Sequence, residues 1–162
     1  MQTFRPLVRI VVMNALLVIA LGALATAPAA AQALKVKGQT LYVPVYSHIY
    51  SGNRERPTYL AATVSIRNTD PIHAIQLEAV DYFDSEGKRV RRYLENPITL
   101  KPMASTRYVV SESDKAGGSG ANFIVRWKSD QPVNPPIAEG IMISTASQLG
   151  ISFTSRAQVI KE

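Results

Sequence analysis

The segment of this chain best suited to anion chemistry is the glycine-rich run Gly117-Gly118-Ser119-Gly120-Ala121-Asn122. Glycines allow successive backbone N–H groups to converge on an anion. A phosphate-binding loop also needs a lysine and a helix after the glycines, whereas Phe123-Ile124-Val125 predicts a strand. The sequence therefore excludes a nucleotide-binding loop. Two interpretations remain, a ligand-contacting loop and a flexible connector, and the connector is favoured.

Carboxylates occur in two arrangements that could support chemistry. Asp81, Asp84 and Glu86 could hold calcium, but an EF-hand loop needs more carboxylates, and a hairpin turn explains Asp84. Asp81 with Glu78 or Asp114 could supply the acid and base of a small hydrolase if the fold placed two of them in one pocket. No sequence pattern places them together. We therefore predict no catalytic residue, no metal ligand and no cofactor, and we keep a carboxylate-based periplasmic hydrolase as the alternative.

A basic run, Lys88-Arg89-Val90-Arg91-Arg92, lies on an expected strand. Alternation divides these cations between the two faces of the strand, so a flat anion-binding patch would require a twisted hairpin. A solvated strand, or one whose charges protect a sheet edge, is the favoured interpretation. His48 and His73 stand alone and are predicted to have surface or strand-face roles.

The elements that must position these residues are short strands. Apolar and polar residues alternate with the two-residue period of a half-buried strand, and turn signals recur about every 8–12 residues. This pattern predicts an all-β fold, and we expect a single immunoglobulin-like antiparallel β-sandwich of about eight or nine strands. The expected strands cover residues 40–50, 59–68, 75–83, 89–95, 98–100, 106–110, 122–128, 137–145 and 151–160. Phe123, Val125 and Trp127 share one face and are predicted to be core.

Residues 1–33 have the three parts of a secretory signal peptide. Arg5 and Arg9 give a positive start, an apolar run covers Ile10–Ala25, and small residues follow with cleavage patterns after Ala31 and Ala33. The apolar run would span only about 24 Å as a helix, less than the roughly 30 Å of a bilayer core, so cleavage is favoured over a retained anchor. We therefore predict a signal peptide over residues 1–33, general secretion to the periplasm or beyond it, and one domain over residues 34–162.

The composition of the chain excludes several kinds of cysteine chemistry and argues against nucleic acid as a partner. The chain has 162 residues, no cysteine and a formal net charge of +6. Without cysteine there are no disulfides, iron–sulfur clusters or cysteine nucleophiles. Loss of residues 1–33 would leave 129 residues and a charge of +4, because Arg5 and Arg9 leave with the leader. This mild charge and the predicted export argue against nucleic acid as a partner, and no stable membrane anchor is expected after cleavage.

The chain also resembles a bacterial family of exported proteins known as the domain of unknown function numbered 3124. The resemblance covers nearly all of residues 38–156, and it implies no activity and no assigned binding residues. The segments that carry it are Gly38-Gln39-Thr40-Leu41-Tyr42-Val43-Pro44-Val45-Tyr46-Ser47, Ala62–Asp70, Arg91-Arg92-Tyr93-Leu94, Gly117–Phe123, Asn134-Pro135-Pro136-Ile137 and Gly150–Arg156.

Taken together, these features predict a non-catalytic exported module that binds an envelope protein, a peptide or a polymer. Contacts are expected from the loops at residues 111–122 and 130–136, or from an exposed edge strand that pairs with a partner strand. The candidate contact residues are Arg91, Gly117, Gly118, Gly120, Asn122, Asn134 and Arg156. Tyr42, Tyr46 and Tyr50 share a strand face, which suits either packing against the other sheet or a ligand-facing aromatic strip.

Overall fold

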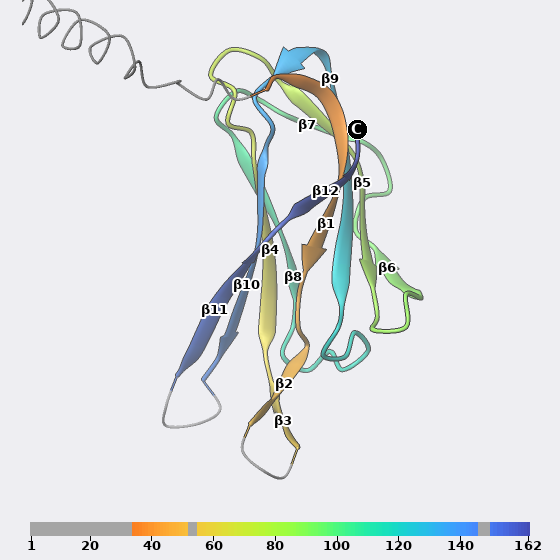
Figure 1. The fold of residues 1–162 in the computed structure, drawn as a ribbon, viewed down its shortest axis with the longest axis vertical. Helices are drawn as coiled ribbons and strands as arrows, with labels where there is room; N and C mark the ends of the chain where they lie inside the picture. Colours follow the sequence, from red (N-terminus) through yellow and green to blue (C-terminus); the bar gives the residue numbers. More distant parts are fainter. Residues whose placement is uncertain (1–33, 52–54, 146–149) are drawn as a thin grey trace, which may run out of the picture. The chain divides into compact units, whose positions relative to one another are not determined.

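The computed structural model describes residues 34–51, 55–145 and 150–162, and this part of the chain is all-β (Figure 1). The predicted leader, residues 1–33, lies outside the described residues. None of the described residues forms a helix long and apolar enough to cross a membrane. The strands are β1 (Val36–Pro44), β2 (His48–Ser51), β3 (Arg56–Tyr59), β4 (Ala61–Arg67), β5 (Ile75–Phe83), β6 (Arg89–Arg92), β7 (Ile98–Leu100), β8 (Ser105–Val110), β9 (Asn122–Val133), β10 (Ile137–Ser144), β11 (Ile151–Arg156) and β12 (Gln158–Lys161).

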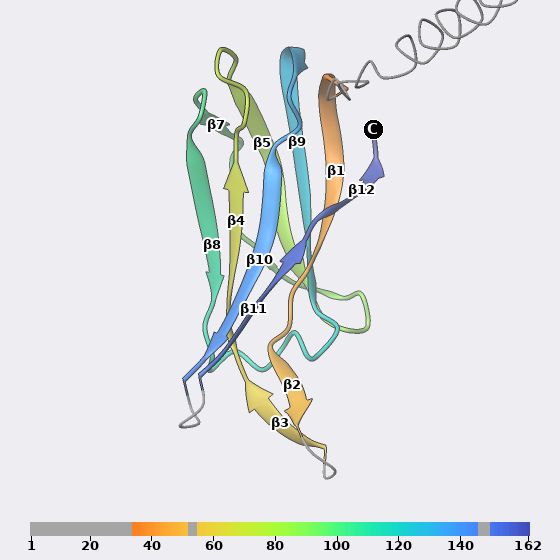
Figure 2. The same ribbon diagram turned by 60° about the vertical axis from the view of Figure 1, so that its left-hand side comes forward.

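Two open antiparallel sheets pack face to face, which confirms the predicted β-sandwich (Figure 2). The larger sheet has the order β12-β1-β9-β5-β6, and β7 also pairs with β5. The smaller sheet has the order β11-β10-β4-β8. Strands β2 and β3 form a separate two-stranded hairpin.

The central strands pair as in an immunoglobulin-like Greek key. Strand β4 pairs with β8 in one sheet and β5 pairs with β9 in the other, which corresponds to the B–E and C–F pairs of that fold. The first and last strands of that fold lie in the opposite sheets here. Strand β1 pairs with β9 and not with β4, whereas β10 pairs with β4 and not with β9. The chain later returns to the first sheet, since β12 pairs with β1. This return places a crossover between the two sheets near the C-terminus.

More strands form than the eight or nine expected, because two of the expected strands are divided and a further short strand appears. The expected strand over 40–50 ends at Pro44, whose ring nitrogen cannot donate to a ladder, and pairing resumes in β2. The expected strand over 151–160 is divided at Ala157, where the chain passes from β11 in one sheet to β12 in the other. Strand β3 pairs with β2 and completes the small hairpin.

The core lies between the two sheets. Alternate residues of β1, β9 and β5 point inward and meet alternate residues of β4 and β10. Tyr82 and Phe123 are the largest fully buried side chains, and their rings lie 5.0 Å apart. Trp127, predicted to be core, is 2% exposed.

Candidate binding groove

The sequence-predicted contact residues occupy both ends and both edges of the sandwich. Strand β9 begins at Asn122 and ends at Val133, so it separates the glycine loop from Asn134 by about 40 Å of strand. In the strand order of the sheets, β6 with Arg91 lies at the opposite edge from β11 and β12, where Arg156 lies. The structure therefore brings the glycines and Asn122 together, and it places Arg91 two strands away at the same end of the sheet, opposite Tyr82. Asn134 and Arg156 are separated from them.

The glycine loop is fastened to neighbouring turns by its backbone. The Ser85 N–H and hydroxyl both donate to the Gly117 carbonyl, at 2.9 and 3.1 Å. The Gly120 N–H donates back to the Ser85 hydroxyl at 2.9 Å, and the Ser47 N–H donates to the Gly118 carbonyl at 2.9 Å. These bonds give the loop a defined connecting role at this end of the sandwich.

Two of the glycines are required by their surroundings. A Cβ atom at Gly117 would overlap the buried Tyr82 hydroxyl and would lie 2.7 Å from the Ser47 hydroxyl oxygen. Gly118 has a φ of +78°, which other residues rarely adopt. These requirements are structural, so we expect alanine at either position to affect folding. Gly120 has more room, because its nearest neighbour would be the Ser85 hydroxyl oxygen at 3.3 Å.

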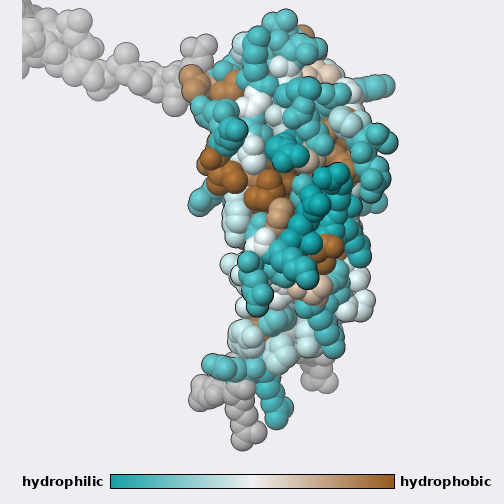
Figure 3. All heavy atoms as spheres, turned by 90° about the vertical axis from the view of Figure 1, so that its right-hand side faces the viewer, coloured by the Kyte–Doolittle hydropathy of each residue, from teal (hydrophilic) through white to brown (hydrophobic). Residues whose placement is uncertain are grey.

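Arg91 belongs to the exposed edge strand β6. All four residues of β6 are exposed, and Figure 3, which turns this side toward the viewer, shows a mainly hydrophilic surface. The Arg91 guanidinium carbon lies 5.4 Å from the centre of the Tyr93 ring. An exposed, strongly basic edge strand resists pairing with other chains, as the solvated-strand interpretation requires.

Asn134 takes part in a polar network that ties three loops together. The Asn134 N–H donates to the Asp70 carboxylate at 3.2 Å, and the Asn68 side chain donates to the carbonyls of His73, Leu100 and Lys101. Hydrogen bonds from the backbone N–H groups of His73 and Ile72 hold the pKa of Asp70 well below its usual range, against the opposing effect of burial. The Asn134 side chain donates to the Thr69 carbonyl at 3.5 Å, so it is engaged at the same loop junction.

The carboxylates considered for a hydrolase have separate partners. Glu78 pairs with Lys128 at 2.7 Å, and the buried Asp81 pairs with Arg92 at 3.5 Å. Asp114 accepts the Ala116 N–H in its own loop at 2.9 Å. Asp84 accepts the N–H groups of Glu86 and Lys88, as the hairpin-turn interpretation predicts. This geometry lends no support to a paired-carboxylate mechanism.

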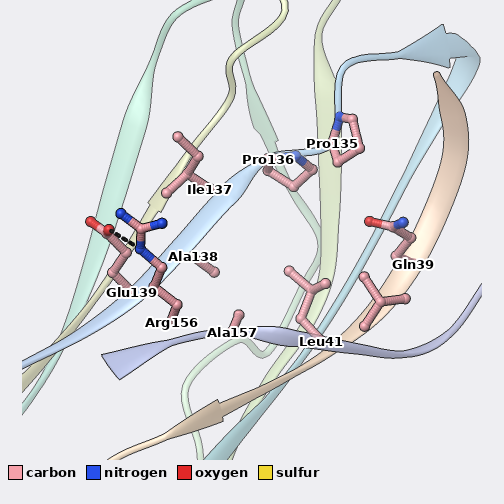
Figure 4. A pocket seen from close by; sticks show the side chains of 10 residues that line it. Gln39, Leu41, Pro135, Pro136, Ile137, Ala138, Glu139, Arg156 and Ala157 are labelled. Atoms are coloured by element: carbon pink, nitrogen blue, oxygen red, sulfur yellow. Dashed lines mark ion pairs between the residues drawn. The ribbon is translucent and has the colours of Figure 1, made fainter. Parts of the chain in front are cut away.

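A groove of about 280 Å³ lies at the edge where the chain crosses between the sheets (Figure 4). Leu41 of β1 and Ala138 of β10 contribute to it from the two sheets, and Ala157 and Val159 come from the crossover and β12. The other lining residues are Gln39, Pro135, Pro136, Ile137, Glu139 and Arg156. The groove thus unites Arg156 with Pro135 and Pro136 of the expected loop at 130–136. That loop is shorter than expected, because residues 130–133 belong to β9.

The crossover that shapes the groove is held at two points. The Ala157 N–H donates to the Ala138 carbonyl at 3.0 Å, and the Ser155 hydroxyl donates to the Pro44 carbonyl. The β10–β11 ladder ends at Glu139 and Arg156, so beyond the Ala157–Ala138 hydrogen bond Ile137 pairs with β4 alone. Strand β12 is likewise the last strand of its sheet. Two strand edges therefore border one preformed groove.

The polar groups of the groove lie at Gln39 and at the Glu139–Arg156 pair. Gln39 is 8% exposed, its side chain projects into the groove (Figure 4), and its buried Oε1 atom has no hydrogen-bond partner in the described structure. Arg156 Nε lies 3.9 Å from Glu139 Oε1, and the Arg156 side chain is 89% exposed. Such a loose, solvated ion pair contributes little to stability and remains open to other partners.

Gln39 is a candidate site residue that was not predicted from the sequence. A signal was present, because Gln39 occupies the same strand face as the buried Leu41 and Val43. A polar side chain on a buried strand face is expected to form a hydrogen bond, either with another group of the protein or with a bound molecule.

The architecture defines this protein as an all-β sandwich whose sheets are joined at one edge by a crossover, with a groove beside it. The chain belongs to the family described as Protein of unknown function (DUF3124), whose model matches residues 38–160. No curated protein and no solved structure matches the chain.

Proposed function

We propose that this protein is an exported, non-catalytic binding module that holds an envelope protein, peptide or polymer in the groove between β10 and β12. The observation that carries the proposal is Gln39, which lines the groove and whose buried Oε1 atom has no hydrogen-bond partner in the described structure. A buried acceptor without a donor costs folding free energy, commonly about 1–3 kcal/mol, and a bound group would recover it.

The walls of the groove suit binding better than catalysis. Most of its lining is apolar, including Leu41, Pro135 and Ile137, and its volume is close to the lower range of small-ligand sites. Its one carboxylate, Glu139, already pairs with Arg156. A partner that covers Ile137 and Val159, which are 48% and 47% exposed, would bury apolar surface that water now contacts.

Site-specific photo-crosslinking tests this function in cells. A photoreactive amino acid is placed at Ile137, beside the groove, in the full chain exported by a bacterial host with its own leader. The matched control is Val109 on β8, which is 49% exposed and lies at the opposite edge of the same sheet. We expect a discrete crosslinked product from position 137 and none from position 109.

A second variant connects the crosslink to the groove. Replacement Ala157→Leu adds bulk to the groove lining and leaves the Ala157 N–H free to bond with Ala138. We expect this change to remove the crosslink from position 137. Equal crosslinking from positions 137 and 109, or a product that Ala157→Leu leaves unchanged, would contradict a groove-bound partner.

A further inference from the structure

Strand β11 forms one edge of the smaller sheet, and half of its backbone groups face away from that sheet (Figure 2). The Ala157 N–H donates to the Ala138 carbonyl at 3.0 Å, which continues the β10–β11 register by one residue pair. In an antiparallel ladder, residues that bond to the neighbouring strand alternate with residues that face away from it. By this alternation, the backbone N–H and C=O groups of Ser152, Thr154 and Arg156 face the open edge.

The other edge of the same sheet confirms this alternation. The Asn68 N–H donates to the Ala104 carbonyl at 2.9 Å, and the β4–β8 register then turns Val109 away from β4. The Tyr93 hydroxyl reaches the Val109 carbonyl from that side, at 2.9 Å. The hydrogen bonds at the ends of the ladders therefore identify which residues face each edge.

Strand β11 lacks the features that protect other strand edges of the sandwich. Strand β6 is exposed and strongly basic, β12 ends at Lys161, and β8 presents Arg107 at its edge. From Ile151 to Ser155, β11 has no charged residue and no proline, and its pairing with β10 continues without a register shift. An edge without such protection is a ready template for another strand.

The sequence of β11 is complementary to itself in one antiparallel register. When Thr154 lies opposite Thr154 of a second copy, Ser152 lies opposite Arg156. All three residues face the edge, so each opposed pair can exchange two backbone hydrogen bonds. Their side chains are exposed, a threonine pair is favourable across strands, and no two like charges are opposed.

We propose that two copies of this protein associate edge to edge through β11, in the antiparallel register centred on Thr154. The pairing is isologous, and it joins two four-stranded sheets into one continuous sheet. It uses backbone groups of β11 and goes beyond the proposed function, on which it does not depend. The same backbone groups are open to a strand of a different protein, and cysteine crosslinking separates the two partners.

Analytical ultracentrifugation of the mature, exported chain tests the association. We expect the average mass to rise from one chain toward two over about a hundredfold increase in protein concentration. Thr154→Lys places two like charges opposite one another, and we expect it to hold the mass at one chain. Ser105→Lys adds the same charge to an exposed residue at the edge of β8, and this control should associate as the parent does. The urea midpoint of each variant checks that it folds.

Cysteine crosslinking tests the pairing at its centre, because the chain has no cysteine of its own. Opposed residues of a hydrogen-bonded pair have Cα atoms about 5.5 Å apart, which lies within the span of a disulfide. We expect Thr154→Cys to form a disulfide-linked dimer under mild oxidation. Ser105→Cys, at the edge of β8, is the control and should remain largely monomeric.

A mixture of two single variants tests the register. Ser152→Cys and Arg156→Cys lie opposite one another in the proposed dimer, so we expect a mixed disulfide when the two proteins are oxidised together. In either variant alone the two cysteines are four residues out of alignment, about 14 Å along the strands, and little crosslinking is expected.

The inference fails if the mass stays at one chain throughout, or if a dimer forms that Thr154→Lys leaves intact. It also fails if Thr154→Cys crosslinks no better than Ser105→Cys, or if Ser152→Cys crosslinks to itself as readily as to Arg156→Cys. A Thr154→Cys product that contains a different protein of the host envelope would assign the edge of β11 to that partner and overturn the dimer.

Discussion

The hydroxyl groups of Ser47 and Tyr82 lie 2.9 Å apart in the interior of the sandwich, although 35 residues separate them in the chain. Burial raises the pKa of Tyr82, against the lowering effect of the Ser47 hydrogen bond, so the phenol stays protonated. Gly117 lies directly against this pair, with no space for a Cβ atom. One buried hydrogen bond thus joins the residue before the small hairpin to strand β5, and the glycine loop packs against this bond.

We predict that Gly117→Ala destabilises the protein by about 1–3 kcal/mol, because the added methyl group overpacks the Ser47–Tyr82 contact. Gly120→Ala is the matched control and should have a much smaller effect, since its nearest neighbour is a hydroxyl that can rotate. Urea unfolding followed by the fluorescence of Trp127 measures both. Equal stabilities of the two variants would show that the loop adjusts around Gly117.

Asp70 should make the stability of this protein sensitive to acid. The pKa of Asp70 is lowered in the folded state by the backbone N–H groups of His73 and Ile72, so the unfolded chain binds the proton more readily. This contribution to stability is present above the unfolded value of about 3.9 and is lost as the pH falls below it. We expect the urea midpoint of the parent to drop between pH 7 and pH 3 more than that of Asp70→Asn. Parallel losses in the two proteins would assign the acid sensitivity to other groups.

Tyr93 should fasten the two sheets together at the edge away from the groove. It follows β6 of the larger sheet, its hydroxyl donates to the Val109 carbonyl of β8 at 2.9 Å, and its ring packs against Tyr108 and Phe123. We predict a loss of about 1 kcal/mol for Tyr93→Phe, which removes only the hydrogen bond. Tyr93→Ala also removes the packing and should cost about 3 kcal/mol. Similar unfolding free energies for the two variants would mean that the ring contributes little.

The predicted leader can be tested by the mass of the exported protein. Mass spectrometry under native conditions, on protein exported with its own leader, should give a chain that begins at Gln32 or Leu34. The same spectrum reports any retained ligand, which would appear as a stoichiometric extra mass. A chain that still begins at Met1 would contradict cleavage and would favour a retained N-terminal segment.

Local patterns in the sequence were sufficient for the all-β class and for much of the core. Strand alternation and turn residues act over a few positions, so the sandwich and the burial of Phe123, Val125 and Trp127 could be predicted from them. The family resemblance was likewise confirmed over residues 38–160. The break at Pro44 also has a local cause, the missing N–H of its ring.

The groove could not be predicted in this way, because its residues meet only after distant strands have paired. Gln39 and Ala157 lie 118 positions apart, and they line one hollow because the chain changes sheets at Ala157. The place of that crossover depends on which strands pair and in which register, which long-range packing decides. The sequence by itself therefore determined the kind of sheet and which residues could be buried. Only the tertiary structure decided which polar atoms, those of Gln39 and Trp127 among them, are buried without a hydrogen-bond partner.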